Sequence, residues 1–221
     1  MMNRSKDGDV HVVRMCNGEN RVDLDFLAAL NRELDAVEQD ATGPCGLVLT
    51  GEGKFFSTGL NLDFLMTATD EQRAEFGPLI LRTYRRLILF PVPVVAALNG
   101  HAFAAGAFLA LACDFRIQRQ DRGWFCVSEI DVGVPIGKPM GGLLKGKLSP
   151  AIAREAALTG KRYDGPAAVA AGISDAVASE EDLVAEATKI AEGLASKGRD
   201  IFGQVKAELY REIADGYLDP S

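Results

Sequence analysis

Two stretches of this sequence decide its fold, and they share one design. The first is Phe55-Phe56-Ser57-Thr58-Gly59-Leu60-Asn61-Leu62, and the second is Asn99-Gly100-His101-Ala102-Phe103-Ala104-Ala105-Gly106-Ala107-Phe108. Each follows an apolar run, carries small residues and leads into a helical pattern, so a ligand could approach its backbone and meet unpaired N–H groups. Two such N–H groups converging on one oxygen would form an oxyanion hole. Either stretch alone is more often a tight turn packed into a core.

Around these stretches, strand and helix patterns alternate, which is typical of the α/β class. Strands are expected at Val10–Met15, Gly46–Thr50, Val94–Leu98, Phe115–Gln118 and Trp124–Val127, the last two joined by a polar turn over 119–123. Gly51–Gly59 is expected to be a glycine-rich loop. Helices are expected at Asp23–Gln39, Glu71–Phe90 and Ala104–Cys113, and from Pro150 after a Ser149 N-cap. A further helix is expected at Glu180–Lys197, after a capping arrangement of Ser179 with Asp182. The last is expected at Asp200–Asp215, where Ile201, Val205, Leu209 and Ile213 recur at helical spacing.

Composition excludes two classes of partner. The 221 residues include 24 Lys and Arg against 31 Asp and Glu, for a net charge of −7. A surface of that sign repels a phosphate backbone, and no basic patch interleaved with aromatic residues is present, so no nucleic-acid partner is expected. The longest apolar runs, Leu87–Leu98 and Ala102–Cys113, are shorter than the about 18 residues of a membrane span, so no membrane partner is expected either.

The sequence also predicts where the protein is located and whether it binds a metal. The four cysteines include no CxxC pair, which favours a reducing compartment, and the two histidines are too few for a zinc site. The first residues lack the apolar core of a secretory signal, and Leu218-Asp219-Pro220-Ser221 is not a Ser-Lys-Leu peroxisomal tail. A cytoplasmic protein is therefore expected, with no metal.

Several common motifs fail on inspection. Gly51-Glu52-Gly53 would open a dinucleotide-binding fingerprint, but Phe56 occupies the third glycine position. Gly141 to Lys147 has P-loop spacing, yet Leu148 stands where Ser or Thr must reach magnesium. No G-x-S-x-G elbow supplies a hydrolase nucleophile. Nucleotide hydrolysis, nicotinamide chemistry and zinc hydrolysis are not leading hypotheses.

Five pieces in order resemble the crotonase (enoyl-CoA hydratase/isomerase) superfamily, whose members act on acyl-CoA thioesters. They are Phe56–Leu62, Pro93–Gly100, Ala112–Asp114, Ser128–Gly133 and Ala170–Ile173. The resemblance implies an α/β fold in which stacked β-β-α turns form a spiral core over residues 1–177. It further implies a C-terminal helical region over 178–221 that makes the contacts of a homotrimer or a dimer of trimers. No cofactor is implied beyond the coenzyme A of the substrate.

The resemblance also assigns residue roles by position. The N–H groups of Leu60 and Ala105 would form the oxyanion hole, and Glu129 would be the catalytic base. Asn61 stands where many members carry aspartate, and Ala104-Ala105-Gly106 replaces a glycine-richer run. The residues implied to bind substrate are Lys54 near the coenzyme A phosphates, Ser57, Thr58 and Gly59 along the pantetheine, Ser128 at the acyl chain, and Leu60, Asn61, Ala105, Gly106 and Phe108 around the thioester.

Phe108 distinguishes among the reactions of this family. Hydratases of the family resemble one another in carrying two catalytic glutamates, and here Phe108 occupies the first of those positions while Glu129 occupies the second. A single base suffices to move a double bond, so the chain is most similar to the single-glutamate Δ3,Δ2-enoyl-CoA isomerases, the plant-type ones above all. One positioned base contributes about 10²–10⁴ in rate and one oxyanion donor about 10²–10³, which is enough for enolate chemistry without a metal.

Other readings of the same residues remain open. They are another reaction of the family (hydration, thioester hydrolysis or decarboxylation) and a non-catalytic acyl-CoA binder. Asp131 would share a strand face with Glu129 if the strand continues, so it is the reserve base. His101 is expected to be structural, with a hydrogen bond to backbone near the second stretch, and Asp114 is expected to make a backbone or cap contact.

Overall fold

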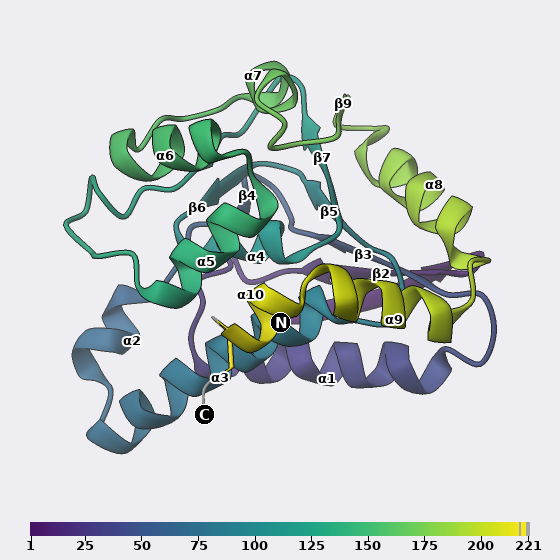
Figure 1. The fold of residues 1–221 in the computed structure, drawn as a ribbon, viewed down its shortest axis with the longest axis horizontal. Helices are drawn as coiled ribbons and strands as arrows, with labels where there is room; N and C mark the ends of the chain where they lie inside the picture. Colours follow the sequence, from purple (N-terminus) through teal and green to yellow (C-terminus); the bar gives the residue numbers. More distant parts are fainter. Residues whose placement is uncertain (217, 220–221) are drawn as a thin grey trace.

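The strands form two sheets (Figure 1). From β3 to β8 the chain alternates between the larger and the smaller sheet. The computed structural model describes residues 1–216 and 218–219. The larger sheet has the order β1-β2-β3-β5-β7-β9, parallel throughout except for the antiparallel β1–β2 pair. Its strands are β1 (Met2–Asp7), β2 (Val10–Met15), β3 (Gly46–Thr50), β5 (Val94–Leu98), β7 (Phe115–Arg119) and β9 (Ala176–Ala178). The smaller, parallel sheet contains β4 (Phe55–Ser57), β6 (His101–Phe103) and β8 (Phe125–Cys126).

This arrangement is the spiral that the sequence resemblance implied. After each of the strands β3, β5 and β7 of the larger sheet, the chain crosses to the smaller sheet and forms β4, β6 and β8, respectively. Gly51–Gly59 was wrongly expected to be a loop throughout, because Phe55 and Ser57 pair with residues 101 and 102. The strand predicted at Phe115–Gln118 is present and extends one residue further, and the one predicted at Trp124–Val127 is present but shorter. The two strands belong to different sheets.

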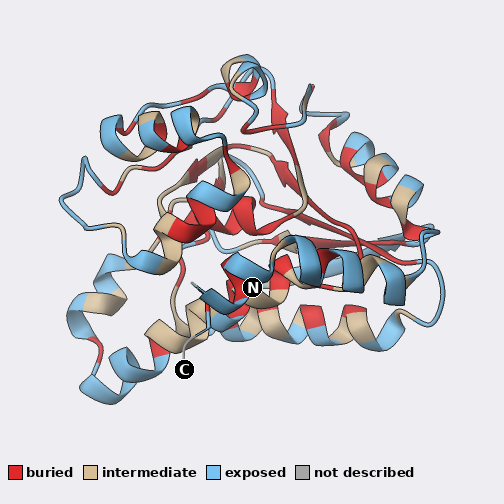
Figure 2. Cartoon of the chain, in the orientation of Figure 1, coloured by how far each residue is buried: buried red, intermediate tan, exposed pale blue. Residues whose placement is uncertain are grey.

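The helices cover both faces of the larger sheet (Figure 1). Their bounds are α1 (Leu24–Asp40), α2 (Leu62–Thr67), α3 (Asp70–Ile88), α4 (Ala105–Ala112), α5 (Lys138–Lys147), α6 (Pro150–Thr159), α7 (Gly165–Ala170), α8 (Leu183–Ala195), α9 (Arg199–Leu209) and α10 (Arg211–Gly216). Helix α8 packs on one face through a small cluster that includes Val48, Val95 and Ala187. The main core, on the other face, joins α1, α3 and α4. The residues of both clusters lie in the segments drawn as buried in Figure 2.

Two expected helices differ from the prediction. The helix expected from Glu180 begins at Leu183, because the Ser179 hydroxyl accepts the Asp182 N–H at 3.1 Å and closes a turn before the helix. The helix expected over Asp200–Asp215 is interrupted at Tyr210 and forms α9 and α10. By contrast, Ser149 caps α6 as expected, since its side chain accepts the Ile152 N–H.

A buried ion pair ties α9 to the core. The Asp114 Oδ2 accepts both the Val94 N–H and the Lys206 ammonium at 2.8 Å. Asp114 therefore makes the backbone contact expected of it, and it also holds a lysine that helical periodicity did not mark as buried. The apolar stripe Ile201, Val205 and Leu209 lies on the exposed side of α9, with exposures of 62%, 58% and 68%.

The sequence analysis predicted a C-terminal helical region, part of the same domain, from residue 178. That boundary falls within β9, the edge strand of the larger sheet. Pro220 and Ser221, which belong to the tail compared above with a peroxisomal signal, lie outside the described residues. Among the residues the structure describes, no helix combines the length and apolarity needed to cross a membrane.

Candidate active site

The two stretches that decide the fold contact each other backbone to backbone. A Cβ atom on Gly106 would lie 2.4 Å from the Ser57 carbonyl oxygen, so only glycine fits there. Gly59 has φ +99°, and a Cβ on it would lie 2.9 Å from the Ala104 Cβ. The pairing of β4 with β6 continues into this contact, which brings Leu60 and Ala105 to neighbouring positions.

Two backbone N–H groups at this contact are free to bind a ligand. Among the described residues, neither the Leu60 N–H nor the Ala105 N–H has an acceptor in the protein. Ala105 is the first residue of α4, whose N-cap Ala104 has φ 49° and provides no side-chain acceptor. The helix dipole adds partial positive charge at the same end, so the contact suits an anionic oxygen.

The loop over residues 55–62 is stabilised by Asn20, which the sequence analysis did not identify as a site residue. Its side-chain amide donates to the carbonyl oxygens of Phe55 at 3.3 Å and Phe56 at 3.1 Å. The Ser57 hydroxyl donates to the Asn20 carbonyl at 2.7 Å and accepts the Gly59 N–H at 3.2 Å. Ser57 therefore stabilises the loop by its side chain, while Asn20 itself adopts a positive φ of 50°.

Asn61 caps α2 and fastens it to the start of α1. Its Oδ1 accepts the Phe64 N–H at 3.3 Å, and its Nδ2 donates to the Asp23 Oδ2 at 2.8 Å. Asp23 in turn accepts the Phe26 N–H as the N-cap of α1. An ionised aspartate at position 61 could not donate this bond.

We expect Asn61→Asp to destabilise the protein by about 1–3 kcal/mol, because the substitution replaces a charge-assisted hydrogen bond with two facing carboxylates. Urea denaturation at neutral pH measures the loss, which should shrink near pH 4 as carboxyl groups take up protons. Asn61→Ser keeps a capping oxygen without adding charge and should lose less. Equal stability of Asn61→Asp and wild type would contradict this account of the contact.

Glu129 lies just beyond β8, where the chain turns away from the smaller sheet. The turn is closed by a bond from the Val134 N–H to the Glu129 carbonyl at 2.9 Å. The side chain is only 9% exposed, and within the described residues its Oε2 has no hydrogen-bond partner. Burial raises the pKa of this carboxyl, because the charged form is poorly solvated there. A buried carboxylate without a cation beside it is typical of a general base.

Tyr84 connects Glu129 with the free N–H groups, and no sequence pattern marked it. Its hydroxyl donates to the Ala105 carbonyl at 2.7 Å. Burial and the charge of Glu129 both raise the pKa of this phenol, so the carboxylate lies close enough to act on it. Tyr84 therefore contacts the residue that carries one predicted N–H donor.

Asp131 does not share a strand face with Glu129, the condition under which it was expected to be the reserve base. Strand β8 ends at Cys126, so residues 129 and 131 share no strand face. The Asp131 carboxylate is exposed and lies against Gly160, since a Cβ on that glycine would come 2.5 Å from Asp131 Oδ2. The premise of the prediction is therefore wrong.

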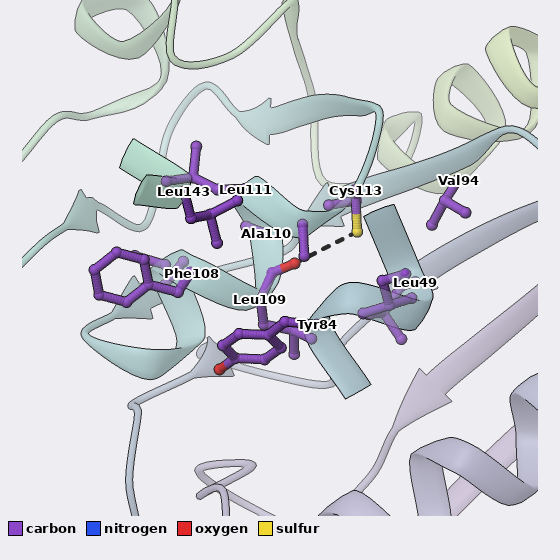
Figure 3. Packing of buried hydrophobic residues seen from close by; sticks show 14 of the residues in the cluster. Leu49, Tyr84, Val94, Phe108, Leu109, Ala110, Leu111, Cys113 and Leu143 are labelled. Atoms are coloured by element: carbon purple, nitrogen blue, oxygen red, sulfur yellow. Dashed lines mark hydrogen bonds between the residues drawn. The ribbon is translucent and has the colours of Figure 1, made fainter. Parts of the chain in front are cut away.

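Three further expectations concern side chains around the loops. Phe108 is buried in the main core (Figure 3). The His101 ring packs among Phe55, Phe103 and Trp124 with centroid distances of 4.9–5.7 Å. The backbone hydrogen bond expected of its side chain is absent from the described part of the chain, where Nδ1 has no partner.

The remaining predicted residues lie along the edges of the two loops. Lys54 is exposed, and its carbonyl accepts the His101 N–H at 3.0 Å. Thr58 is half-buried, and its N–H donates to the Glu19 carbonyl at 3.0 Å. Ser128 is half-buried beside Glu129. In the described part of the chain, no group of three or more His, Cys, Asp or Glu side chains could hold a metal ion.

Comparisons with known proteins point in one direction. The profile of the family described as Enoyl-CoA hydratase/isomerase matches residues 6–217. The chain is 33% identical to enoyl-CoA delta isomerase 2, peroxisomal, of Arabidopsis thaliana, over 96% of this chain and 93% of that relative. Its structure is similar to that of a probable enoyl-CoA hydratase of Mycobacterium tuberculosis, with a TM-score of 0.91, 26% identity, and coverage of 99% and 93%. Human mitochondrial delta3-delta2-enoyl-CoA isomerase shares the fold, with a TM-score of 0.90 at 24% identity and coverage of 97% and 85%.

Proposed function

This chain belongs to the enoyl-CoA hydratase/isomerase family, and from that premise we propose that it converts 3-enoyl-CoA to 2-trans-enoyl-CoA. One observation supports the choice among the reactions of the family: within the described residues Glu129 is a buried carboxylate beside the loops, whereas Phe108, to which the resemblance assigns the position of the second glutamate, is a buried apolar side chain. Adding water requires groups that manage both the water and the proton at C2, whereas moving a double bond requires one base. The Arabidopsis relative that matches nearly the whole chain bears the name of such an isomerase.

In the proposed reaction, the substrate thioester oxygen accepts the N–H groups of Leu60 and Ala105. The Glu129 carboxylate removes a proton from C2, and the negative charge spreads over the dienolate onto the thioester oxygen. The same carboxyl then returns the proton at C4, which leaves the double bond between C2 and C3. The free N–H groups stabilise the charge where it develops, and Phe108 keeps water from the carbon atoms.

The proposal extends to the parts of the substrate beyond the reacting atoms. Lys54 would meet the phosphates of coenzyme A, and Ser57, Thr58 and Gly59 would line the pantetheine through backbone groups. Asn61 and Gly106 shape the loops around the thioester, and Ser128 would contact the acyl chain. The chemistry requires no cofactor beyond the coenzyme A of the substrate.

We propose a homotrimer, alone or as a dimer of trimers, as the assembly. The exposed apolar stripe of α9, formed by Ile201, Val205 and Leu209, supports a contact between copies. A cytoplasmic location is also proposed, because the four cysteines Cys16, Cys45, Cys113 and Cys126 are free.

The test of the proposed function is a pair of assays on the wild-type protein. One follows conversion of a 3-enoyl-CoA to the 2-trans isomer, and the other follows hydration of 2-trans-enoyl-CoA, the activity suggested by the name of the Mycobacterium relative. We expect isomerisation to exceed hydration by at least about 10², the contribution of one missing acid–base group. Hydration at a rate equal to isomerisation would contradict the proposal, and turnover of neither substrate would favour thioester hydrolysis, decarboxylation or acyl-CoA binding alone.

A further inference from the structure

Tyr84 occupies a place that the proposed reaction does not yet use. The residue lies in α3 and its side chain is 0% exposed, in the same buried cluster as Phe108 and Leu109 (Figure 3). A buried phenol must find a hydrogen-bond partner, and this one donates to the carbonyl of Ala105 at 2.7 Å. Ala105 is both the first residue of α4 and the carrier of one free N–H group. The hydroxyl therefore fixes the first turn of the helix that faces the substrate.

The start of α4 depends on such an external bond. Its N-cap residue, Ala104, has φ 49° and ψ −123°, a backbone conformation that an L residue with a Cβ adopts only under strain. Alanine also lacks a side-chain acceptor, so α4 has no cap of its own. The Tyr84 hydroxyl does not cap the N–H groups at this end of α4, but its bond to the Ala105 carbonyl holds the peptide plane of residues 105–106 in one orientation.

Helix α3 is a rigid support for the phenol. The residue before it, Thr83, accepts a hydrogen bond at 2.8 Å from Asn31 of α1. Two residues further along, Arg86 forms an ion pair with Asp35 of the same helix at 2.7 Å. These two contacts fasten α3 to α1 on either side of Tyr84, so the ring cannot shift without moving both helices.

The phenol also lies within the electrostatic reach of Glu129. Burial, and to a lesser degree the charge of Glu129, raises the pKa of the Tyr84 hydroxyl. The hydroxyl proton is directed at the Ala105 carbonyl, so Tyr84 remains a neutral donor beside the base.

We propose that Tyr84 is a positioning residue, which orients the Ala105 N–H toward the thioester oxygen and sets its place relative to Glu129. The inference rests on the proposed function for its reaction, because it assumes that the Ala105 N–H binds a thioester oxygen. It assigns no proton transfer to Tyr84. The residue acts through Ala105, and its contribution is geometric.

The test compares Tyr84→Phe with Tyr163→Phe, which removes the hydroxyl of a second fully buried tyrosine. The Tyr163 hydroxyl donates to Glu155 at 2.6 Å, in a contact with no part in the proposed chemistry. We expect Tyr84→Phe to lower kcat about tenfold with KM changed less than about twofold, the loss that corresponds to one misplaced hydrogen bond. Tyr163→Phe should leave kcat within about twofold of wild type. Thermal melting of both variants compares their folded stability.

A binding measurement separates this inference from the proposed reaction. Saturated acyl-CoA labelled with ¹³C at the thioester carbonyl cannot isomerise, but its carbonyl chemical shift reports the hydrogen bonds to that oxygen. We expect a downfield shift on binding to wild type and to Tyr163→Phe, and a clearly smaller one on binding to Tyr84→Phe. That pattern in a protein without isomerase activity would reject the proposed function and support the role of Tyr84. An unchanged carbonyl shift and an unchanged kcat in Tyr84→Phe would overturn the inference.

Discussion

Glu129→Gln is expected to reduce kcat for isomerisation of 3-enoyl-CoA by about 10²–10⁴, with little change in KM, because the amide keeps the size of the side chain but cannot accept the C2 proton. The carboxylate is buried and its Oε2 has no partner among the described residues, so no neighbouring group is placed to take over. Steady-state kinetics on both proteins measure the loss.

Asp131→Asn is the matched control for this variant. It removes a carboxylate two residues away that is exposed and lies against Gly160. Activity should be retained within about twofold, since the group has no place in the proposed acid–base chemistry. A large loss in Asp131→Asn together with an active Glu129→Gln would contradict the assignment of the base.

The raised pKa of Glu129 predicts how activity and stability depend on pH in the wild type and in Glu129→Gln. Because the base must be ionised, kcat/KM of the wild type should fall on the acid side at a pH above the ordinary glutamate value of 4.5. Folding favours the neutral form of this group, so its contribution to stability is fully present below the unfolded-state pKa and is lost as pH rises through the folded-state pKa. The free energy of unfolding of Glu129→Gln, minus that of wild type, should therefore increase from acid to neutral pH. Urea denaturation of both proteins over this range measures the difference.

Gly106→Ala is expected to reduce kcat/KM by about 10²–10³, because it forces apart the two loops that carry the free N–H groups. The new methyl group would lie 2.4 Å from the Ser57 carbonyl oxygen and 2.7 Å from the Ser57 Cβ. Backbone on both sides of this contact cannot yield without moving Leu60 away from Ala105. The loss should appear in kinetics and as a smaller carbonyl shift of bound ¹³C-labelled acyl-CoA.

Gly193→Ala controls for the addition of a methyl group. Gly193 lies within α8, and nothing lies within 4 Å of a Cβ placed there. Alanine favours a helix more than glycine does, so this variant should be at least as stable as wild type and fully active. Full activity in Gly106→Ala would show that close contact of the loops is not required for the reaction.

The parts of the fold that were predicted correctly are those with an uninterrupted local signal. Gly46–Thr50 and Val94–Leu98 are continuous apolar runs between turn residues, and both strands have those bounds. The three-residue strands β4 and β6 were not predicted, because each lies in a glycine-containing stretch and is defined by pairing with residues about 45 positions away. Pairing of that kind carries no local periodicity.

The candidate site follows the same division. Small residues at 59 and 104–106 marked the two loops, and the structure brings those loops together. The supports of the loops were not foreseeable, because Asn20 and Tyr84 act through hydrogen bonds to carbonyl groups remote in sequence. Asp131 shows the opposite error: a spacing of two residues predicts a shared face only while the strand continues, and β8 ends at Cys126.

The central claim is that one shielded carboxyl carries a proton from C2 to C4. The most direct test is isomerisation in ordinary water of a 3-enoyl-CoA that bears deuterium at C2, followed by NMR of the early product. The buried position of Glu129 predicts that a substantial fraction of the product carries deuterium at C4. Product whose added C4 hydrogen comes entirely from solvent would contradict a single shielded base.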